Sequence, residues 1–134
     1  MARLFRVIVP VGDVELAARF YGTLLGQDGV RVSPGRHYFD CEGVILACYS
    51  PRGDGDDWDA VSNPDHLYFA VDDLQAVYGR ASQLGALSTE VGDGGLPMGE
   101  IAQRPWGERS FYLQDPFGNK LCFVDLATVF RGPG

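Results

Sequence analysis

The run Val11-Gly12-Asp13-Val14 is echoed sixty positions later by Val71-Asp72-Asp73-Leu74. Each run follows an apolar stretch that has the character of a strand, at residues 4–10 and at residues 65–71. Internal repetition at a fixed spacing is typical of a chain that uses one supersecondary unit twice. The repeat therefore predicts two similar modules.

A helical pattern follows each run. Apolar residues recur on one face over residues 14–25 and again over residues 74–84, as a helix packed on a sheet requires. Asp13 and Asp73 stand at the N-cap positions, where a carboxylate accepts hydrogen bonds from the first free amides of a helix. Glycine follows each helix at the place where a left-handed residue usually ends it.

Short strands with turn residues between them come after each helix. In the first half they are predicted at residues 29–32, 37–41 and 44–49. In the second half the matching pair is predicted at residues 109–114 and 120–125, joined by a proline- and glycine-containing turn. Each half therefore reads β-α-β-β-β, which predicts an α+β fold.

One domain of 134 residues is expected, built from two such modules. The first module is predicted at residues 1–50 and the second at residues 65–126. Between them, residues 51–64 are rich in aspartate and are expected to form a solvated linker, and residues 127–134 form a tail.

Composition excludes several classes of protein. The net charge of −7 argues against a nucleic-acid binder, which needs a basic face, and no apolar run is long enough to span a membrane. Three cysteines without paired spacing predict neither a disulfide framework nor a zinc knuckle. A reducing, cytoplasmic location is expected.

Two sequence motifs resemble those of a known protein family. They are Arg19-Phe20-Tyr21-Gly22-Thr23-Leu24-Leu25-Gly26 and the run from Trp106 that ends in Asp115-Pro116-Phe117-Gly118-Asn119. With the paired modules, they resemble the vicinal oxygen chelate superfamily, which includes glyoxalase I, extradiol dioxygenases, fosfomycin-modifying enzymes and bleomycin resistance proteins. The resemblance covers residues 4–125 and implies two βαβββ modules whose sheets curve around a trough.

The resemblance also implies four metal-ligand positions. In metal-dependent members, the first and last strands of each half offer His, Gln, Glu or Tyr side chains to a divalent ion, which polarises two neighbouring substrate oxygens. Here the four positions fall on Arg6, Ala47, His66 and Cys122. Only His66 is an expected ligand, and a guanidinium has no lone pair to offer a cation. No metal and no other cofactor is therefore expected, and a divalent metal held by His66 is the alternative.

Arg6 needs a partner of its own. By strand alternation Arg6 and Ile8 face the trough, where an unpaired buried charge would cost several kcal/mol. The partner could be an anionic or carbonyl-bearing ligand, an internal acid such as Glu100 or Glu108, or water at the strand end.

The trough is expected to bind a small organic molecule, since apolar walls with few polar groups suit such ligands. Trp106 is expected either to cap the trough or to pack under the linker, and His37 is expected to be structural. No catalytic residue is assigned. The predicted ligand-binding residues are Arg6, Ile8, Tyr49, His66, Tyr68, Trp106 and Cys122.

The resemblance thus favours a metal-free protein of the bleomycin-resistance type, which would sequester or carry its ligand. Two enzymatic alternatives stay open: a metal-dependent lyase, isomerase or dioxygenase that uses His66, and a metal-free enzyme in which His66 or Cys122 does acid–base work. A homodimer is expected, because relatives often pair and two-fold dimers are the commonest oligomers. No membrane or nucleic-acid partner is expected.

Overall fold

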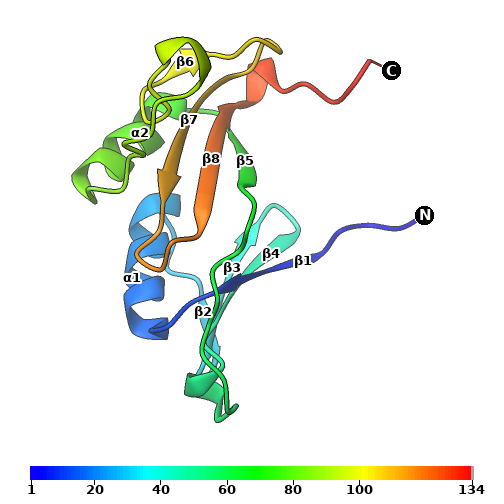
Figure 1. The fold of residues 1–134 in the computed structure, drawn as a ribbon. Helices are drawn as coiled ribbons and strands as arrows, with labels where there is room; N and C mark the ends of the chain where they lie inside the picture. The colour runs from blue at the N-terminus through cyan, green and yellow to red at the C-terminus, as the bar shows by residue number, and fades with distance from the viewer. Residues whose placement is uncertain (134) are drawn as a thin grey trace. The chain divides into compact units, whose positions relative to one another are not determined.

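The computed structural model describes residues 1–133, which form two compact units. The first unit consists of Met1–Pro64 together with Pro116–Asn119, and the second consists of Asp65–Asp115 and the residues from Lys120 on. Each unit has one α-helix and one four-stranded sheet (Figure 1). The predicted α+β fold of two β-α-β-β-β modules is confirmed.

In the first unit the sheet order is β1-β4-β3-β2, with β1 parallel to β4 and the other neighbours antiparallel. A 3-10 turn, Arg52–Asp54, follows the last strand. The elements in chain order are β1 (Arg6–Pro10), α1 (Val14–Leu25), β2 (Val30–Ser33), β3 (Arg36–Cys41) and β4 (Val44–Tyr49).

The second unit repeats this topology with the order β5-β8-β7-β6, and β5 is parallel to β8. Strand β6 is only two residues long and had no predicted range, because the glycine-rich insertion at residues 92–99 separates it from α2. The elements are β5 (Leu67–Val71), α2 (Leu74–Gln83), β6 (Ala102–Gln103), β7 (Arg109–Gln114) and β8 (Lys120–Asp125).

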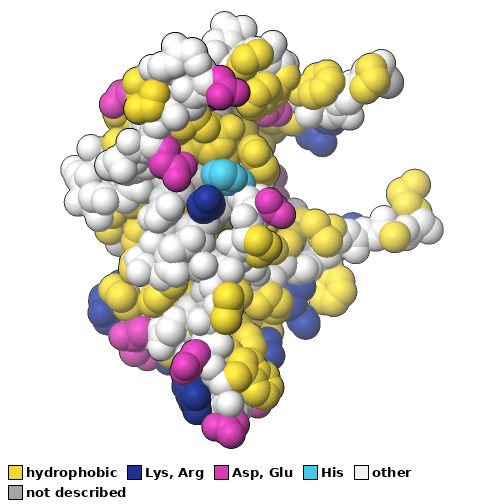
Figure 2. Space-filling view, in the orientation of Figure 1, with side chains coloured by type: hydrophobic (Ala, Val, Ile, Leu, Met, Phe, Trp, Pro, Cys, Tyr) yellow, Lys and Arg dark blue, Asp and Glu magenta, His cyan; other side chains and the backbone are white. Residues whose placement is uncertain are grey.

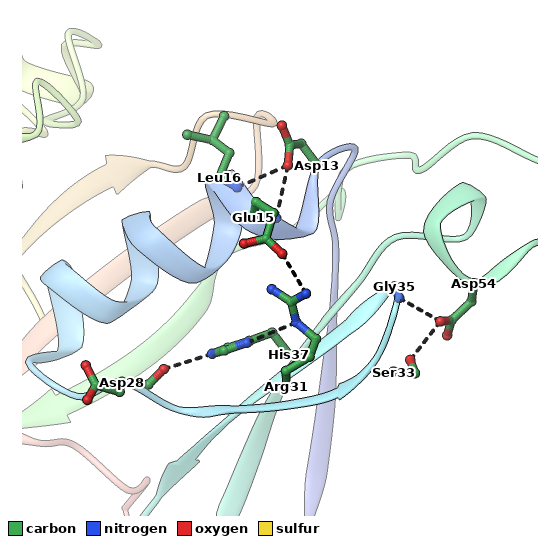
Figure 3. Close-up of polar contacts among 9 residues, drawn as sticks. All are labelled: Asp13, Glu15, Leu16, Asp28, Arg31, Ser33, Gly35, His37 and Asp54. Carbon is green, nitrogen blue, oxygen red and sulfur yellow. Dashed lines mark hydrogen bonds and ion pairs between the residues drawn. The ribbon is translucent and has the colours of Figure 1, made fainter.

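Both helices begin at the predicted aspartates. The Asp13 carboxylate accepts from the amides of Glu15 and Leu16 at 3.0 and 3.1 Å (Figure 3), and Asp73 accepts from the amide of Ala76 at 3.1 Å. These bonds satisfy amides that have no partner within the helix. Helix α1 ends at left-handed Gly26, as predicted, while α2 ends one residue before the predicted end, at Gln83.

Each sheet buries one face against its own helix. In the first unit the buried rings of Tyr21 and Phe39 join α1 to β3, and in the second Tyr78 on α2 meets Phe111 edge to face. Phe123 then stacks on Phe111 beneath that contact. Burial of such aromatic side chains stabilises each helix on its sheet.

The opposite face of each sheet, turned away from its own helix, is here called the far face. Strand alternation assigns its residues, because successive side chains point to opposite sides. On the first far face lie Arg6, Ile8, Tyr38, Ala47 and Tyr49, and on the second lie Tyr68, Ala70, Tyr112, Cys122 and Val124.

The segment at residues 51–64, most of it exposed, is hydrogen-bonded to the first unit. The Asp54 carboxylate accepts from the Ser33 hydroxyl and the Gly35 amide, both at 2.7 Å (Figure 3). Further along, the amide of Asn63 donates to the buried side chain of Asn119 at 2.8 Å. Asn119 in turn donates to the carbonyl of Pro10 at 2.7 Å, which explains why the turn at residues 116–119 belongs to this unit.

Across the described part of the chain, neither helix has the length and apolar character needed to cross a membrane.

Candidate functional site

Arg6 and His66 hold equivalent places in the two units. The Arg6 guanidinium carbon lies 5.7 Å from the ring centroid of Tyr38 on β3, and the His66 ring lies 5.1 Å from that of Tyr112 on β7. Tyr38 and Tyr112 are themselves equivalent in strand register. Each far face therefore sets a basic side chain against a tyrosine.

The residues beside these tyrosines differ in chemistry. Tyr38 is paired across the ladder with Ala47, whereas Tyr112 is paired with Cys122. On the outer strands Ile8 is next to Ala47 and Tyr68 is next to Cys122. The structure thus brings Arg6 and Ile8 together in the first unit, and His66, Tyr68 and Cys122 together in the second.

The Arg6 side chain is exposed, and its guanidinium is held by rings alone. It lies 5.0 Å from the Phe5 ring as well as against Tyr38, and none of the ion pairs among residues 1–133 includes it. Glu100 and Glu108 have other partners, the hydroxyl of Tyr78 and the indole of Trp106. A ligand or water remains as the partner of Arg6.

Tyr49 offers its ring but not its hydroxyl. The hydroxyl donates to Asp56, and that bond raises the pKa of Tyr49. The guanidinium of Arg36 covers the ring at 4.2 Å and is neutralised by Asp54 at 3.2 Å. Tyr49 can therefore act as a wall of a site, while its polar end is already used.

His66 is half-buried just before β5. Burial lowers its pKa from the ordinary value of 6.5, and the nearby charge of Lys120 lowers it further. The imidazole is therefore neutral at neutral pH, with nitrogen atoms able to donate one hydrogen bond and accept another.

Cys122 is a buried thiol rather than a reactive thiolate. Its side chain is 1% exposed, and burial raises the pKa of the thiol to about 11, against smaller opposing effects from Ser110, Tyr112 and Arg104. Burial also raises the pKa of Tyr112. A nucleophilic cysteine needs a lowered pKa, so this environment disfavours covalent chemistry at Cys122.

Two predicted aromatic residues lie at the surface of the second unit. Tyr68 is 61% exposed and Trp106 is 48% exposed, with the Trp106 indole donating to Glu108 at 2.7 Å. Figure 2 shows apolar side chains at several places on the visible surface, among acidic and basic ones. Tyr68 and Trp106 are therefore available to contact a ligand.

A cavity of about 310 Å³ lies on the second unit. Its size falls at the lower end of the range for small-molecule sites. Most of its wall is made by apolar side chains, and Glu108 and Arg131 add charge. The lining residues are Tyr68, Phe69, Ala70, Glu108, Val124, Val129, Phe130 and Arg131. Of the predicted site residues, Tyr68 lines this cavity.

Sequence reasoning missed Arg104. Its side chain is 4% exposed, and its guanidinium carbon lies 5.0 Å from the Tyr112 ring centroid. No role is predicted for this position from the sequence, and an arginine outside a predicted strand or helix is normally exposed. No local pattern in the sequence indicates that the Arg104 side chain folds back over β7.

His37 is structural, as expected. Arg31 donates to its Nδ1 at 3.3 Å, so Nε2 carries the proton and donates to the Asp28 carbonyl at 2.8 Å (Figure 3). The ring is buried beside Phe39 at 5.0 Å. Both nitrogens are used inside the first unit.

The residues at the four family positions do not fit a resident divalent metal. Arg6 brings a positive charge and Ala47 has no donor atom, so two of the four positions offer no ligand to a cation. Within residues 1–133, no three His, Cys, Asp or Glu side chains gather in a group that could hold an ion. His66 is the one residue of the four that matches the ligands of metal-dependent relatives.

The sequence matches one protein family. The family described as the Glyoxalase/Bleomycin resistance protein/Dioxygenase superfamily matches residues 3–123. A comparison with curated proteins found no match.

Several solved structures share the fold. A glyoxalase/bleomycin resistance protein from Albidiferax ferrireducens T118 is 23% identical, with a TM-score of 0.72 over 92% of this chain and 98% of that one. Oxidase ChaP-H2 is 24% identical, with a TM-score of 0.72 over 100% and 99% of the two chains. A lactoylglutathione lyase from Agrobacterium tumefaciens is 19% identical, with a TM-score of 0.68 over 93% and 94%. At these identities the likeness shows the fold and leaves the activity to be argued from the site.

Proposed function

We propose, starting from the fact that this chain belongs to the Glyoxalase/Bleomycin resistance protein/Dioxygenase superfamily, that it binds a small organic molecule without the help of a metal. The ligand is partly aromatic or carries a carbonyl or anionic oxygen. The protein sequesters or carries this molecule, in the manner of the bleomycin-resistance type.

The single observation that carries this proposal is the donor set of the far faces. At the positions where metal-dependent relatives place carboxylates and imidazoles, this chain has Arg6 and Ala47 in the first unit and His66 and the buried Cys122 in the second. What remains is a set of apolar and aromatic surfaces with one cation and one neutral imidazole. Such surfaces bind organic ligands by burial and orient them by few polar contacts.

Each predicted residue has a role in this proposal. Arg6 gives a charge-assisted hydrogen bond, and His66 gives a second polar contact. The apolar contacts come from Ile8, Tyr49, Tyr68 and Trp106, and Cys122 is a small buried neighbour of Tyr112.

A homodimer is part of the proposal. Strand β2 is an edge strand of its sheet and exposes Val30 and Val32 to 66% and 52%. An exposed edge with apolar side chains is a ready surface for pairing with a second copy of the chain. Three free cysteines are compatible with a reducing compartment, which we propose as its location.

A fragment screen by thermal shift tests the function. The screen compares aromatic carboxylates, phenols and neutral carbonyl compounds on metal-stripped protein. We expect several aromatic compounds to raise the melting temperature without added metal, because binding to the folded state alone stabilises it. A response that appears only after a divalent metal is added would instead support the metal-dependent enzyme.

A further inference from the structure

Arg104 is a buried cation that no carboxylate neutralises. Its side chain is 4% exposed, and no ion pair among residues 1–133 includes it. A buried charge without a counter-charge costs several kcal/mol, so proteins usually pair it. The second unit keeps this one unpaired.

The hydrogen bonds of Arg104 leave one nitrogen free. A guanidinium has five N–H donors. Nε donates to the Ser110 hydroxyl at 3.0 Å, and Nη2 donates to the carbonyls of Ser110 and Glu100 at 2.8 and 3.1 Å, with Met98 at 3.4 Å. Nη1 is buried and has no partner. All the acceptors are neutral, so both the charge and two N–H groups remain uncompensated.

The surroundings hold the guanidinium in a fixed plane. One side lies over the Tyr112 ring, whose face offsets part of the charge. Tyr112 forms a buried cluster with Cys122 and Val124, and the partly buried Met98 and Val129 pack against it. A hydrogen bond from a charged group is strong in such apolar surroundings, and little entropy is lost because the donor is already oriented.

We propose that Nη1 of Arg104 binds the anionic oxygen of a small aromatic carboxylate or phenolate on the second unit. This inference rests on the proposed function and names the class of its ligand. The ligand supplies the missing negative charge, and its ring packs among the apolar side chains near Tyr112. The ring enters by displacing the flexible side chain of Met98, which packs against the Tyr112 cluster.

Arg104 and Arg6 differ in how strongly each can bind an anionic ligand. Arg6 is exposed, so water and salt screen its charge. Arg104 is buried, so its bond to an anion is barely screened. We therefore expect benzoate binding to depend more strongly on Arg104 than on Arg6.

The test uses benzoate and its neutral counterpart benzamide at constant ionic strength. We expect benzoate to raise the melting temperature of the wild-type protein more than benzamide does. Calorimetry should show benzoate binding at least tenfold weaker in Arg104→Met, a larger loss than in Arg6→Ala, and partly restored in Arg104→Lys. Arg109→Met is the matched control, because it removes an arginine whose partner, Asp125 at 3.8 Å, lies within the chain, and it should bind benzoate as the wild type does.

Because Arg104 also holds the loop before β7, its variants could unfold. The wild-type protein then gives the answer by NMR of its arginine side chains. Benzoate should shift the Nη resonances of Arg104, and benzamide should leave them in place.

The outcomes separate this inference from the proposed function. If benzamide and benzoate bind equally and the Arg104 resonances do not move, the inference is overturned while small-molecule binding stands. If neither compound nor any other in the fragment screen binds, the proposed function fails and the inference falls with it.

Discussion

The two far faces share one backbone plan but handle positive charge in opposite ways. On the first, Arg36 is neutralised by Asp54 and Arg6 lies exposed against Tyr38. On the second, the equivalent of Arg6 is a neutral imidazole, and the cation near the tyrosine is the buried Arg104. The repeat thus fixes where the side chains lie, while their identities decide whether the unpaired positive charge is exposed, as at Arg6, or buried, as at Arg104.

The largest expected effect is on the free energy of unfolding, and it distinguishes the two equivalent tyrosines. Tyr112 is 5% exposed and lies in the buried cluster, whereas Tyr38 is only half-buried. Tyr112→Ala should lower the free energy of unfolding by about 3 kcal/mol or more, as loss of a buried aromatic ring does, and Tyr38→Ala by about 1 kcal/mol. Urea denaturation measures both. Equal losses would show that the two faces are packed alike and would break the comparison.

The next effect concerns ligand binding at Arg6. With the strongest ligand from the fragment screen, Arg6→Ala should weaken binding by about 1.5–3 kcal/mol, the range for hydrogen bonds to charged groups. This corresponds to about ten- to a hundredfold in affinity. Arg6→Lys should restore part of the loss, since an ammonium lacks the planar fork of donors.

Calorimetry on the wild type, Arg6→Ala and His66→Ala checks this prediction. If all three proteins bind the ligand with the same affinity, neither equivalent basic residue contacts it. The ligand surface would then lie elsewhere in the chain.

A smaller effect concerns the two helix caps. Asp13 accepts two amide hydrogen bonds and Asp73 accepts one. Asp13→Ala should therefore cost about 1–2 kcal/mol of stability and Asp73→Ala about half as much. Thermal or urea unfolding of the two variants measures the difference, with Asp13→Asn and Asp73→Asn as controls that keep a capping oxygen. A larger cost at Asp73 would contradict the account of the caps.

The smallest effect is a pH dependence from His66. Burial and Lys120 hold its pKa below the ordinary value of 6.5, so the unfolded chain takes up a proton before the folded chain does as the pH falls. The stability linked to neutral His66 is complete above about pH 6.5 and is lost as the pH falls from there through the folded-state pKa. His66→Gln should lose less melting temperature than the wild type between about pH 7.5 and 5.5. An NMR titration that placed the pKa of His66 above 6.5 would reverse the sign.

Much of the fold could be predicted because the repeat has local chemical markers. The N-cap aspartates and the left-handed glycines that follow the helices are readable one residue at a time. The short β6 could not be predicted, since two residues have no periodicity.

The candidate site was only partly predictable. Strand alternation placed Arg6, Ile8, Tyr68 and Cys122 on the far faces, because the period of two applies to every strand. The burial of Arg104 depends on a loop that folds back over β7, and no local pattern encodes that contact. The ties of Asp54 to Ser33 and Gly35, which bind the expected linker to the first unit, are also long-range.

A native mass spectrum of the protein as purified reports metal, ligand and assembly together. We expect a homodimer whose mass has no metal contribution, either free of ligand or with a small organic molecule. The His66→Ala variant should likewise show no metal contribution to its mass. One equivalent of a divalent metal per chain, lost on His66→Ala, would contradict the account and support a metal-dependent enzyme.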